Sequence, residues 1–359
     1  MSGRDPMRPE GVFRQDVQSM HAYAIQPSAG LVKLDAMENP HRLSPELQAE
    51  LGRRLGALAI NRYPGDRVND LRAALARHAG MPPGFDIMLG NGSDELISLV
   101  AMACDVPGAS ILAPLPGFVM YEMSAKLQGL KFHGVALTPD FELDEQAMLA
   151  AITEHLPSIV YIAYPNNPTA NLWDDAVIER IVEAAPGLVI FDEAYQPFSS
   201  RSYIDRIAKH EHVLLMRTMS KFGLAGVRIG YMIGPEALVE QVDKVRPPYN
   251  ISVLNCEAAL FALEHAGVFA AQAAQLRSQR TRLHEALARM PAVKSWPSDA
   301  NMILVRVADA ARTFEGMKAR GVLVKNVSRM HPLLANCLRL TVGTADENTQ
   351  LLAAFESSL

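Results

Sequence analysis

The stretch His212–Tyr231, HVLLMRTMSKFGLAGVRIGY, indicates both the fold of this chain and its chemistry. Its first part, HVLLM, is an apolar run typical of a buried β-strand. Lys221 stands in the turn that follows, with the hydroxyl of Ser220 before it and Arg228 seven residues after it. A single loop lysine is usually solvated, so the role of Lys221 depends on what the neighbouring strands carry.

Strands and helices alternate on both sides of this stretch. Apolar runs typical of strands occur in FDIMLGNG (85–92), ASILAPLPG (109–117), KFHGVAL (131–137), PSIVYIAYP (157–165), GLVIFDEAY (187–195) and GYMIG (230–234). Helical stretches separate most of them, which predicts an α/β fold with a mostly parallel sheet covered by helices on both faces. Ligands of such sheets bind at the carboxyl ends of the strands.

Two helices are predicted before the first of these strands. One starts at Ser44, with Pro45 in the first helical position, and stops before Pro64. The other covers residues 67–80 and ends at Gly80, because glycine readily adopts the left-handed conformation that closes a helix.

The chain is predicted to divide into three parts. Residues 1–30 are polar and punctuated by Pro and Gly, which is typical of an arm that is ordered only where it packs on something. Residues 31–250 form the large domain. Residues 251–359 form a smaller α+β domain, with a long helical region followed by the strands VLVKNV (322–327) and CLRLTVG (337–343).

Composition narrows the class of protein. The 359 residues are 49% hydrophobic and carry a net charge of −5 without any basic block, which argues against a nucleic-acid partner. Cys104, Cys256 and Cys337 have neither metal-ligand nor disulfide spacing, which favours a reducing compartment and no bound metal. The N-terminal segment has no apolar core of a signal peptide, and Asp105 and Pro107 interrupt the longest apolar stretch. We therefore expect a cytoplasmic protein without a membrane span.

Two motifs after predicted strands carry turn residues that suit a ligand. In GNGSDE (90–95), Ser93 and Asp94 open a helix after a glycine-rich turn, which makes an anion site or simply a well-capped turn. In YPNNPTA (164–170), Asn167 has two interpretations: its side-chain amide binds a ligand at the strand end, or it belongs to a common Asn-Pro turn. Either motif alone leaves both interpretations open.

Two further motifs carry charge. In FDEAY (191–195), Asp192 directly follows a buried run, where a carboxylate needs a partner such as a protonated ring nitrogen, unless it only caps the next turn. Lys221 can form an imine with an aldehyde, and Thr218, Ser220 and Arg228 are residue types that bind phosphate. In this order and at βαβ spacings, the four motifs predict a pyridoxal 5′-phosphate site.

The same motifs resemble a known family. LDAMENP, NRYPG, GNGSDE, YPNNPTA, FDEAY, TMSKFGLAGVRIGY and NCLRLTVGT occur in the order found in fold-type I, class-II aminotransferases, and are most similar to the histidinol-phosphate aminotransferases. The resemblance covers nearly the whole chain. It implies transamination between L-histidinol phosphate and 2-oxoglutarate, giving imidazole acetol phosphate and L-glutamate, in L-histidine biosynthesis.

The resemblance also implies roles at the cofactor ring. Lys221 would bond to the cofactor aldehyde and then shuttle a proton, and Asp192 would keep the pyridine nitrogen protonated. Tyr195 and Asn167 would hydrogen-bond the ring oxygen. Phe118, in PGFVMY, would stack on the ring, although a plain core position is the alternative.

At the cofactor phosphate, the resemblance implies backbone N–H groups and polar side chains, contributed by Ser93, Asp94, Thr218, Ser220 and Arg228. Tyr63, in NRYPG, matches a family tyrosine that reaches the phosphate in the neighbouring subunit, which implies a homodimer with shared active sites. The alternative for Tyr63 is a helix-end tyrosine that packs on Pro64.

For the substrate, the resemblance implies that Arg339, in CLRLTVG, binds both the glutamate carboxylate and the histidinol phosphate anion. Lys325, in VLVKNV, stands where the family often has a second arginine and supplies charge without a guanidinium fork. Tyr23 and Asn39 match family positions near the substrate.

Three alternatives remain open at this point. An aromatic-amino-acid aminotransferase or a threonine-phosphate decarboxylase would use the same fold and cofactor. A cofactor-sensing transcriptional regulator would need a DNA-binding region, and the chain has no basic helix-turn-helix segment.

Overall fold

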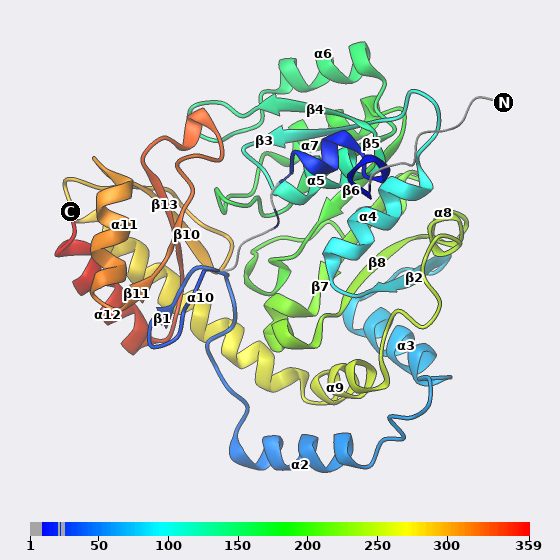
Figure 1. Ribbon diagram of the computed structural model, residues 1–359, viewed down its shortest axis with the longest axis horizontal. Coiled ribbons are helices and arrows are strands. Elements are labelled where there is room, and N and C mark those ends of the chain that lie inside the picture. Colours follow the sequence, from blue (N-terminus) through cyan, green and yellow to red (C-terminus); the bar gives the residue numbers. More distant parts are fainter. Residues whose placement is uncertain (1–8, 21, 23–25) are drawn as a thin grey trace.

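A seven-stranded sheet forms the centre of the computed structural model, which describes residues 9–20, 22 and 26–359 (Figure 1). The strand order is β2-β8-β7-β6-β5-β3-β4, and only β8 runs against its neighbours. The strands are β2 (Phe85–Gly90), β3 (Ser110–Leu115), β4 (Lys131–Ala136), β5 (Ile159–Ala163), β6 (Leu188–Asp192), β7 (Val213–Thr218) and β8 (Gly230–Pro235). The predicted α/β fold with a mostly parallel sheet is confirmed.

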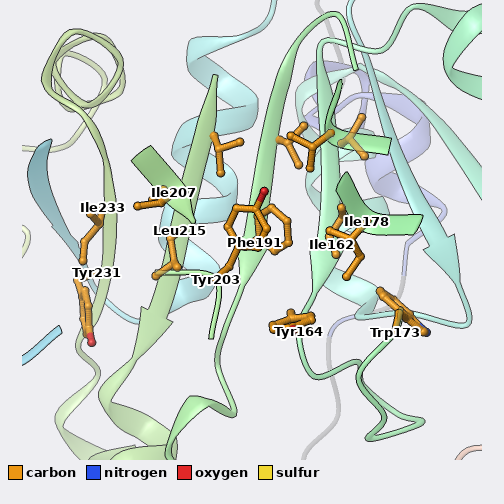
Figure 2. Packing of buried hydrophobic residues seen from close by; sticks show 14 of the residues in the cluster. Ile162, Tyr164, Trp173, Ile178, Phe191, Tyr203, Ile207, Leu215, Tyr231 and Ile233 are labelled. Atoms are coloured by element: carbon orange, nitrogen blue, oxygen red, sulfur yellow. The ribbon is translucent and has the colours of Figure 1, made fainter. Parts of the chain in front are cut away.

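Helices cover both faces of this sheet. One face packs against α3 (Arg67–Ala79), α6 (Glu145–His155), α7 (Asp175–Ala184) and α9 (Val253–Glu264). The other face packs against α4 (Ser93–Ala103), α5 (Val119–Gln128) and α8 (Glu236–Asp243). Because side chains alternate along a strand, Ile162 of β5 joins the first core and Tyr161 the second. Figure 2 shows the first core, in which Ile162, Phe191 and Leu215 project from neighbouring strands.

A second, smaller unit lies at one side of the sheet (Figure 1). Its antiparallel sheet has the order β12-β13-β10-β9, and a parallel pair joins β1 to β11. Its elements are α10 (Ala266–Ala288), β9 (Lys294–Ser295), β10 (Met302–Arg306), α11 (Ala310–Ala319), β11 (Val322–Leu323), β12 (Lys325–Asn326), β13 (Cys337–Thr341) and α12 (Ala345–Glu356), with β1 (Val32–Lys33) from the start of the chain. A separate hydrophobic core holds this unit together.

The hydrophobic cores do not follow the predicted domain boundaries at every residue. The boundaries themselves stay predictions. Leu34 and Met37, after β1, belong to the core of the smaller unit, although they lie inside the range predicted for the large domain. Conversely, α9 contributes Cys256 and Leu260 to the core beside the large sheet. The long helix α10 then runs into the smaller unit.

Local differences from the expected elements have identifiable causes. The single strand expected over residues 322–327 is two strands, because β11 pairs with β1 and the chain then turns so that β12 pairs with β13. Helix α2 (Pro45–Gly56) starts after Ser44, whose side chain accepts the N–H of Leu47, but it ends at Gly56 rather than near Pro64. Glycine weakens a helix, which suits an end at this point. As predicted, Gly80 closes α3 in the left-handed conformation, with φ of 71°.

The N-terminal arm packs on α5 where the structure describes it. Short helix α1 (Gln15–Gln18) follows Arg14, whose guanidinium donates to the carbonyl oxygens of Lys126 and Leu127 at 2.9 and 2.6 Å. These carbonyls lie at the C-terminal end of α5, where a cation is favourable. In the described part of the chain, no single helix is long and apolar enough to cross a membrane; α9 and α10 pass that test only together, and they are bent by 75°.

Candidate active site

The predicted motifs meet at the carboxyl ends of neighbouring strands. Asp192 ends β6 and Thr218 ends β7, which are adjacent and parallel, and β5 leads into the segment that holds Asn167. They surround a cavity of about 350 Å³, a size suited to a small-molecule ligand. Ten predicted site residues line it: Ser93, Asp94, Phe118, Asn167, Asp192, Tyr195, Thr218, Ser220, Lys221 and Arg228.

Asp192 is a buried carboxylate in need of a partner. Its Oδ1 accepts the N–H of Ala194 at 3.1 Å, so the turn-capping role that the sequence left open is also present. Its Oδ2 accepts the hydroxyl of Tyr121 at 2.8 Å. Burial raises the pKa of Asp192 to about 6, and within the described chain no lysine, arginine or histidine forms an ion pair with it. A protonated ring nitrogen in the cavity would supply the missing positive charge.

Lys221 extends into the cavity from a short π-helical turn, Ser220–Leu224, that directly follows β7. Its Nζ donates to the carbonyl oxygen of Ala36 at 2.9 Å. Burial, and next the positive charge of Arg339, lower the pKa of Lys221 to about 8. A neutral amine is therefore accessible near neutral pH, as a nucleophile toward an aldehyde requires.

A cradle for a phosphate lies beside Lys221. Thr218 Oγ1 and Ser220 Oγ are 3.1 Å apart, and Arg228 reaches Ser220 Oγ at 3.4 Å. Helix α4 begins beside this cradle, since Ser93 and Asp94 line the cavity, and its N-cap Gly92 has no side chain to bond the N–H groups of the first turn. A Cβ at Gly92, where φ is 84°, would collide with the Arg228 guanidinium. The positive φ favours glycine here, and with any other residue the Arg228 side chain would have to shift.

A chain of hydrogen bonds links the cavity to the smaller unit. Asn167 Nδ2 donates to the Tyr195 hydroxyl oxygen at 3.0 Å, and Arg339 donates to Asn167 Oδ1 at 2.7 Å. Arg339 comes from β13, is buried, and also donates to the carbonyl oxygen of Asp35 at 2.8 Å. The predicted substrate arginine thus lies next to the predicted ring-binding pair.

Arg339 and four other predicted residues do not line this cavity, and one of the four lies outside the described chain. Tyr63 has 73% of its surface exposed and stacks on Tyr249 with ring centroids 4.0 Å apart. Asn39 donates to Gln272 Oε1 at 2.9 Å. Lys325 pairs with Arg339 across β12 and β13, so both side chains leave the same face of the sheet. Tyr23 lies outside the described residues.

Two features of the cavity were missed at the level of sequence. Tyr121 lines it and bonds Asp192, although only Phe118 was singled out from the same segment. Tyr121 stands three residues after Phe118, and no local pattern in the sequence shows that it bonds Asp192. The segment Ala36–Glu38 also lines the cavity, beside the expected Asn39.

Comparison with known proteins decides the family. A model of the aminotransferase class I and II family matches residues 30–355. The chain belongs to the class I and II aminotransferases. This aminotransferase is 75% identical to a histidinol-phosphate aminotransferase of Polaromonas naphthalenivorans, over 97% of its own length and 96% of the relative. It is 72% identical to a histidinol-phosphate aminotransferase of Methylibium petroleiphilum, over 100% of its own length and 98% of the relative.

A solved structure gives the same fold. The histidinol-phosphate aminotransferase of Sinorhizobium meliloti, in complex with pyridoxal-5′-phosphate, matches this aminotransferase with a TM-score of 0.83 and 24% identity, and the match covers 96% of each chain. These comparisons confirm the family resemblance and the fold class expected from the motifs. The roles of individual site residues stay predictions.

Proposed function

We propose that this aminotransferase transfers the amino group of L-histidinol phosphate to 2-oxoglutarate, giving imidazole acetol phosphate and L-glutamate, in L-histidine biosynthesis. The observation that carries the proposal is the 75% and 72% identity to two histidinol-phosphate aminotransferases over nearly the whole of each chain. The cytoplasmic location expected from the scattered cysteines stays a prediction.

The cofactor of the proposed reaction is pyridoxal 5′-phosphate, and the cavity suits each of its parts. The buried carboxylate of Asp192, which has no cationic partner among the described residues, suits the ring nitrogen, and the cradle of Thr218, Ser220 and Arg228 suits the phosphate. When bound, the cofactor supplies an aldehyde that takes up the amino group and a ring that accepts electrons from the substrate. Lys221 is the only lysine on the cavity wall within the described chain, so it is the residue for the aldehyde.

Lys221 also serves as the general base in the proposed function. With the cofactor bound, the Nζ of Lys221 would accept the proton of the substrate α-carbon and later give a proton back. The pKa of about 8, which burial and Arg339 produce, suits a group that must both accept and donate a proton near neutral pH. The carbonyl oxygen of Ala36 accepts a hydrogen bond from Nζ at the cavity wall.

Tyr195 and Asn167 orient the ring in the proposed function. Burial raises the pKa of Tyr195 above its ordinary value, so its hydroxyl stays a hydrogen-bond donor at neutral pH. Asn167 and Tyr195 are joined by a hydrogen bond of 3.0 Å, which supports a shared role at one ring substituent. Phe118 lies on the cavity wall and would cover one face of the ring.

Arg339 binds the anionic end of both substrates in the proposed function. Its guanidinium is buried and held by Asn167 and the Asp35 carbonyl, so it presents a fixed fork. Lys325 stands opposite it in the sheet and adds a second positive charge for the substrate phosphate. Asn39 and Tyr23 are assigned to the mouth of the site by the family resemblance alone.

The proposed function includes a homodimer with shared active sites. Tyr63 and Tyr249 form an exposed aromatic stack, with 73% and 59% of their surfaces accessible, and Ile60 nearby in the chain is 71% exposed. Exposed large apolar side chains of this kind are typical of protein–protein contacts. In the dimer, Tyr63 reaches the cofactor phosphate of the partner subunit.

A side-by-side assay tests the proposed substrate. Purified holoenzyme is given L-histidinol phosphate, L-phenylalanine or L-threonine phosphate with 2-oxoglutarate, and glutamate and CO₂ are measured. We expect glutamate formation to be fastest with histidinol phosphate, without CO₂ release. Faster turnover of phenylalanine would reassign the chain to the aromatic-amino-acid aminotransferases, and CO₂ release from threonine phosphate would reassign it to the decarboxylases. Lys221→Ala holoenzyme is the inactive control.

A further inference from the structure

Tyr121 makes a direct contact with the carboxylate at the base of the cavity. Its hydroxyl donates to Asp192 Oδ2 at 2.8 Å, and both side chains are buried. The two residues are 71 positions apart in the sequence and come from different elements, since Tyr121 is in α5 and Asp192 ends β6. The other Asp192 oxygen accepts the N–H of Ala194, so each oxygen has one donor and a free lone pair.

The ring of Tyr121 has little freedom to move. It stacks on Tyr161 with centroids 4.2 Å apart and an interplanar angle of 4°. Phe118 meets it edge-on, with centroids 5.6 Å apart. A ring fixed on two sides holds its hydroxyl, and therefore the Asp192 carboxylate, in one orientation.

We propose that Tyr121 is a positioning residue for the cofactor, whose hydroxyl orients the Asp192 carboxylate toward the ring nitrogen and keeps it in the charged form. The inference rests on the proposed function, since it requires pyridoxal phosphate in this cavity. Tyr121 acts through Asp192 and has no reacting atom of its own.

The electrostatics of the site agree with this role. Burial raises the pKa of Asp192 to about 6, while the hydrogen bonds from Tyr121 and Ala194 oppose the rise. Asp94 and Glu193 raise that pKa further. Tyr161 and Tyr195 near the carboxylate stay neutral because burial raises their pKa values, and Lys221 lines the same cavity. Without the Tyr121 donor, the pKa of Asp192 would rise again, and the charged form would become scarcer near neutral pH.

Two matched substitutions separate the hydroxyl of Tyr121 from its ring. Tyr121→Phe removes the hydroxyl that donates a hydrogen bond to Asp192 and keeps the stacked ring. Tyr161→Phe removes an oxygen from the neighbouring buried ring, and that oxygen has no hydrogen-bond partner in the described chain. The two variants therefore lose the same atom from adjacent rings, and only one loses a bond to the carboxylate.

The test measures binding rather than turnover. Apoenzymes of the wild type and both variants are titrated with pyridoxal phosphate, and NMR of isotope-labelled ring nitrogen reports its protonation from pH 6 to 9. For Tyr121→Phe we expect affinity about tenfold weaker, the scale of one hydrogen bond to a charged group. We also expect its ring nitrogen to lose the proton at lower pH than in wild type. Tyr161→Phe should match the wild type in both measurements.

The other outcomes distinguish a failure of the proposed function from a failure of this inference. If wild-type apoenzyme does not bind pyridoxal phosphate, the proposed function fails, and this inference with it. If wild type binds but Tyr121→Phe is unchanged, or if Tyr161→Phe loses as much, the inference alone is overturned. Should Tyr121→Phe not fold, 3-fluorotyrosine at position 121 keeps the shape and makes a stronger donor. The ring nitrogen should then hold its proton to higher pH, and an unchanged titration would overturn the inference.

Discussion

At the scale of single residues, Lys221 shows how environment sets chemistry. Its ammonium would be an ordinary charged group in solution, but burial and then the Arg339 cation lower its pKa to about 8. Only the neutral amine attacks an aldehyde, so covalent attachment of pyridoxal phosphate to the apoenzyme should accelerate as pH rises and level off above about 8. The rate is followed by absorbance after rapid mixing.

Replacing Arg339 tests the cause of that lowered pKa. Removal of a nearby cation makes protonation of Lys221 easier, so Arg339→Gln should move the attachment profile to higher pH. Arg312→Gln, at an exposed position of α11, removes the same charge away from the cavity and should leave the profile unchanged. A profile that does not move in Arg339→Gln would mean that burial alone lowers the pKa.

The sequence predicted single residues best where the chemistry is local. Asp192 ends β6 and Lys221 follows β7 by three residues, so the ends of two neighbouring parallel strands place them together. Arg228 lies in the loop just before the antiparallel strand β8 and lines the same cavity. Tyr121 was missed because its significance lies in a bond to a residue 71 positions away. No local pattern distinguishes a tyrosine that bonds a catalytic carboxylate from Tyr161, whose hydroxyl bonds nothing in the described chain.

At the scale of elements, a buried ion pair joins the ends of β6 and β7. Arg217 donates to Glu193 at 2.9 Å, and both residues neighbour cavity residues, Asp192 and Thr218. Ser202 and the N–H of Tyr203 bond the same carboxylate. Because side chains alternate along a strand, this pair lies on the side away from the cavity and fixes the two strand ends from behind.

Breaking that pair should destabilise the apoenzyme strongly. Arg217→Met leaves the Glu193 charge buried and unpaired, which costs about 3–5 kcal/mol of unfolding free energy. Arg180→Met breaks the exposed pair with Glu145 and should leave the free energy of unfolding nearly unchanged. Urea unfolding of the apoenzymes measures both. Equal losses in the two variants would contradict a special role for the buried pair.

Elements were predicted reliably where the pattern of side chains is self-contained. The alternation of apolar strands and helices from β2 to β8 is such a pattern, and the sheet is confirmed. The run VLVKNV is predicted to be one strand, because its sequence does not show that its two halves pair with different strands. Val322 pairs with Val32, almost at the other end of the chain, while Lys325 pairs with Arg339.

At the scale of the whole molecule, the exposed Tyr63 gives the proposed dimer a sharp test. If Tyr63 completes the partner's site, Lys221→Ala and Tyr63→Ala subunits are complementary. A hybrid dimer of the two has one site with both changes and one site with neither. Unfolding and refolding the two variants together should therefore give more activity than the mean of the separate variants.

The control is a mixture of Lys221→Ala with Asp192→Ala, two residues that line the same cavity of one chain. Every site in that hybrid lacks one of them, so no activity should return. Recovery in the control, or none in the Tyr63 mixture, would contradict sharing of the site through Tyr63. The sequence pointed to this residue only through family resemblance, because a single chain shows Tyr63 on the surface.

One measurement tests most directly whether Lys221 carries the cofactor. Holoenzyme is reduced with borohydride and digested with a protease, and the masses of its peptides are determined by mass spectrometry. We expect a pyridoxyl phosphate adduct on the peptide that contains Lys221 and none in Lys221→Ala, with Lys325→Ala, a change on β12, retaining it. An adduct on another lysine, or a fully active Lys221→Ala enzyme, would contradict the proposed site and the mechanism built on it.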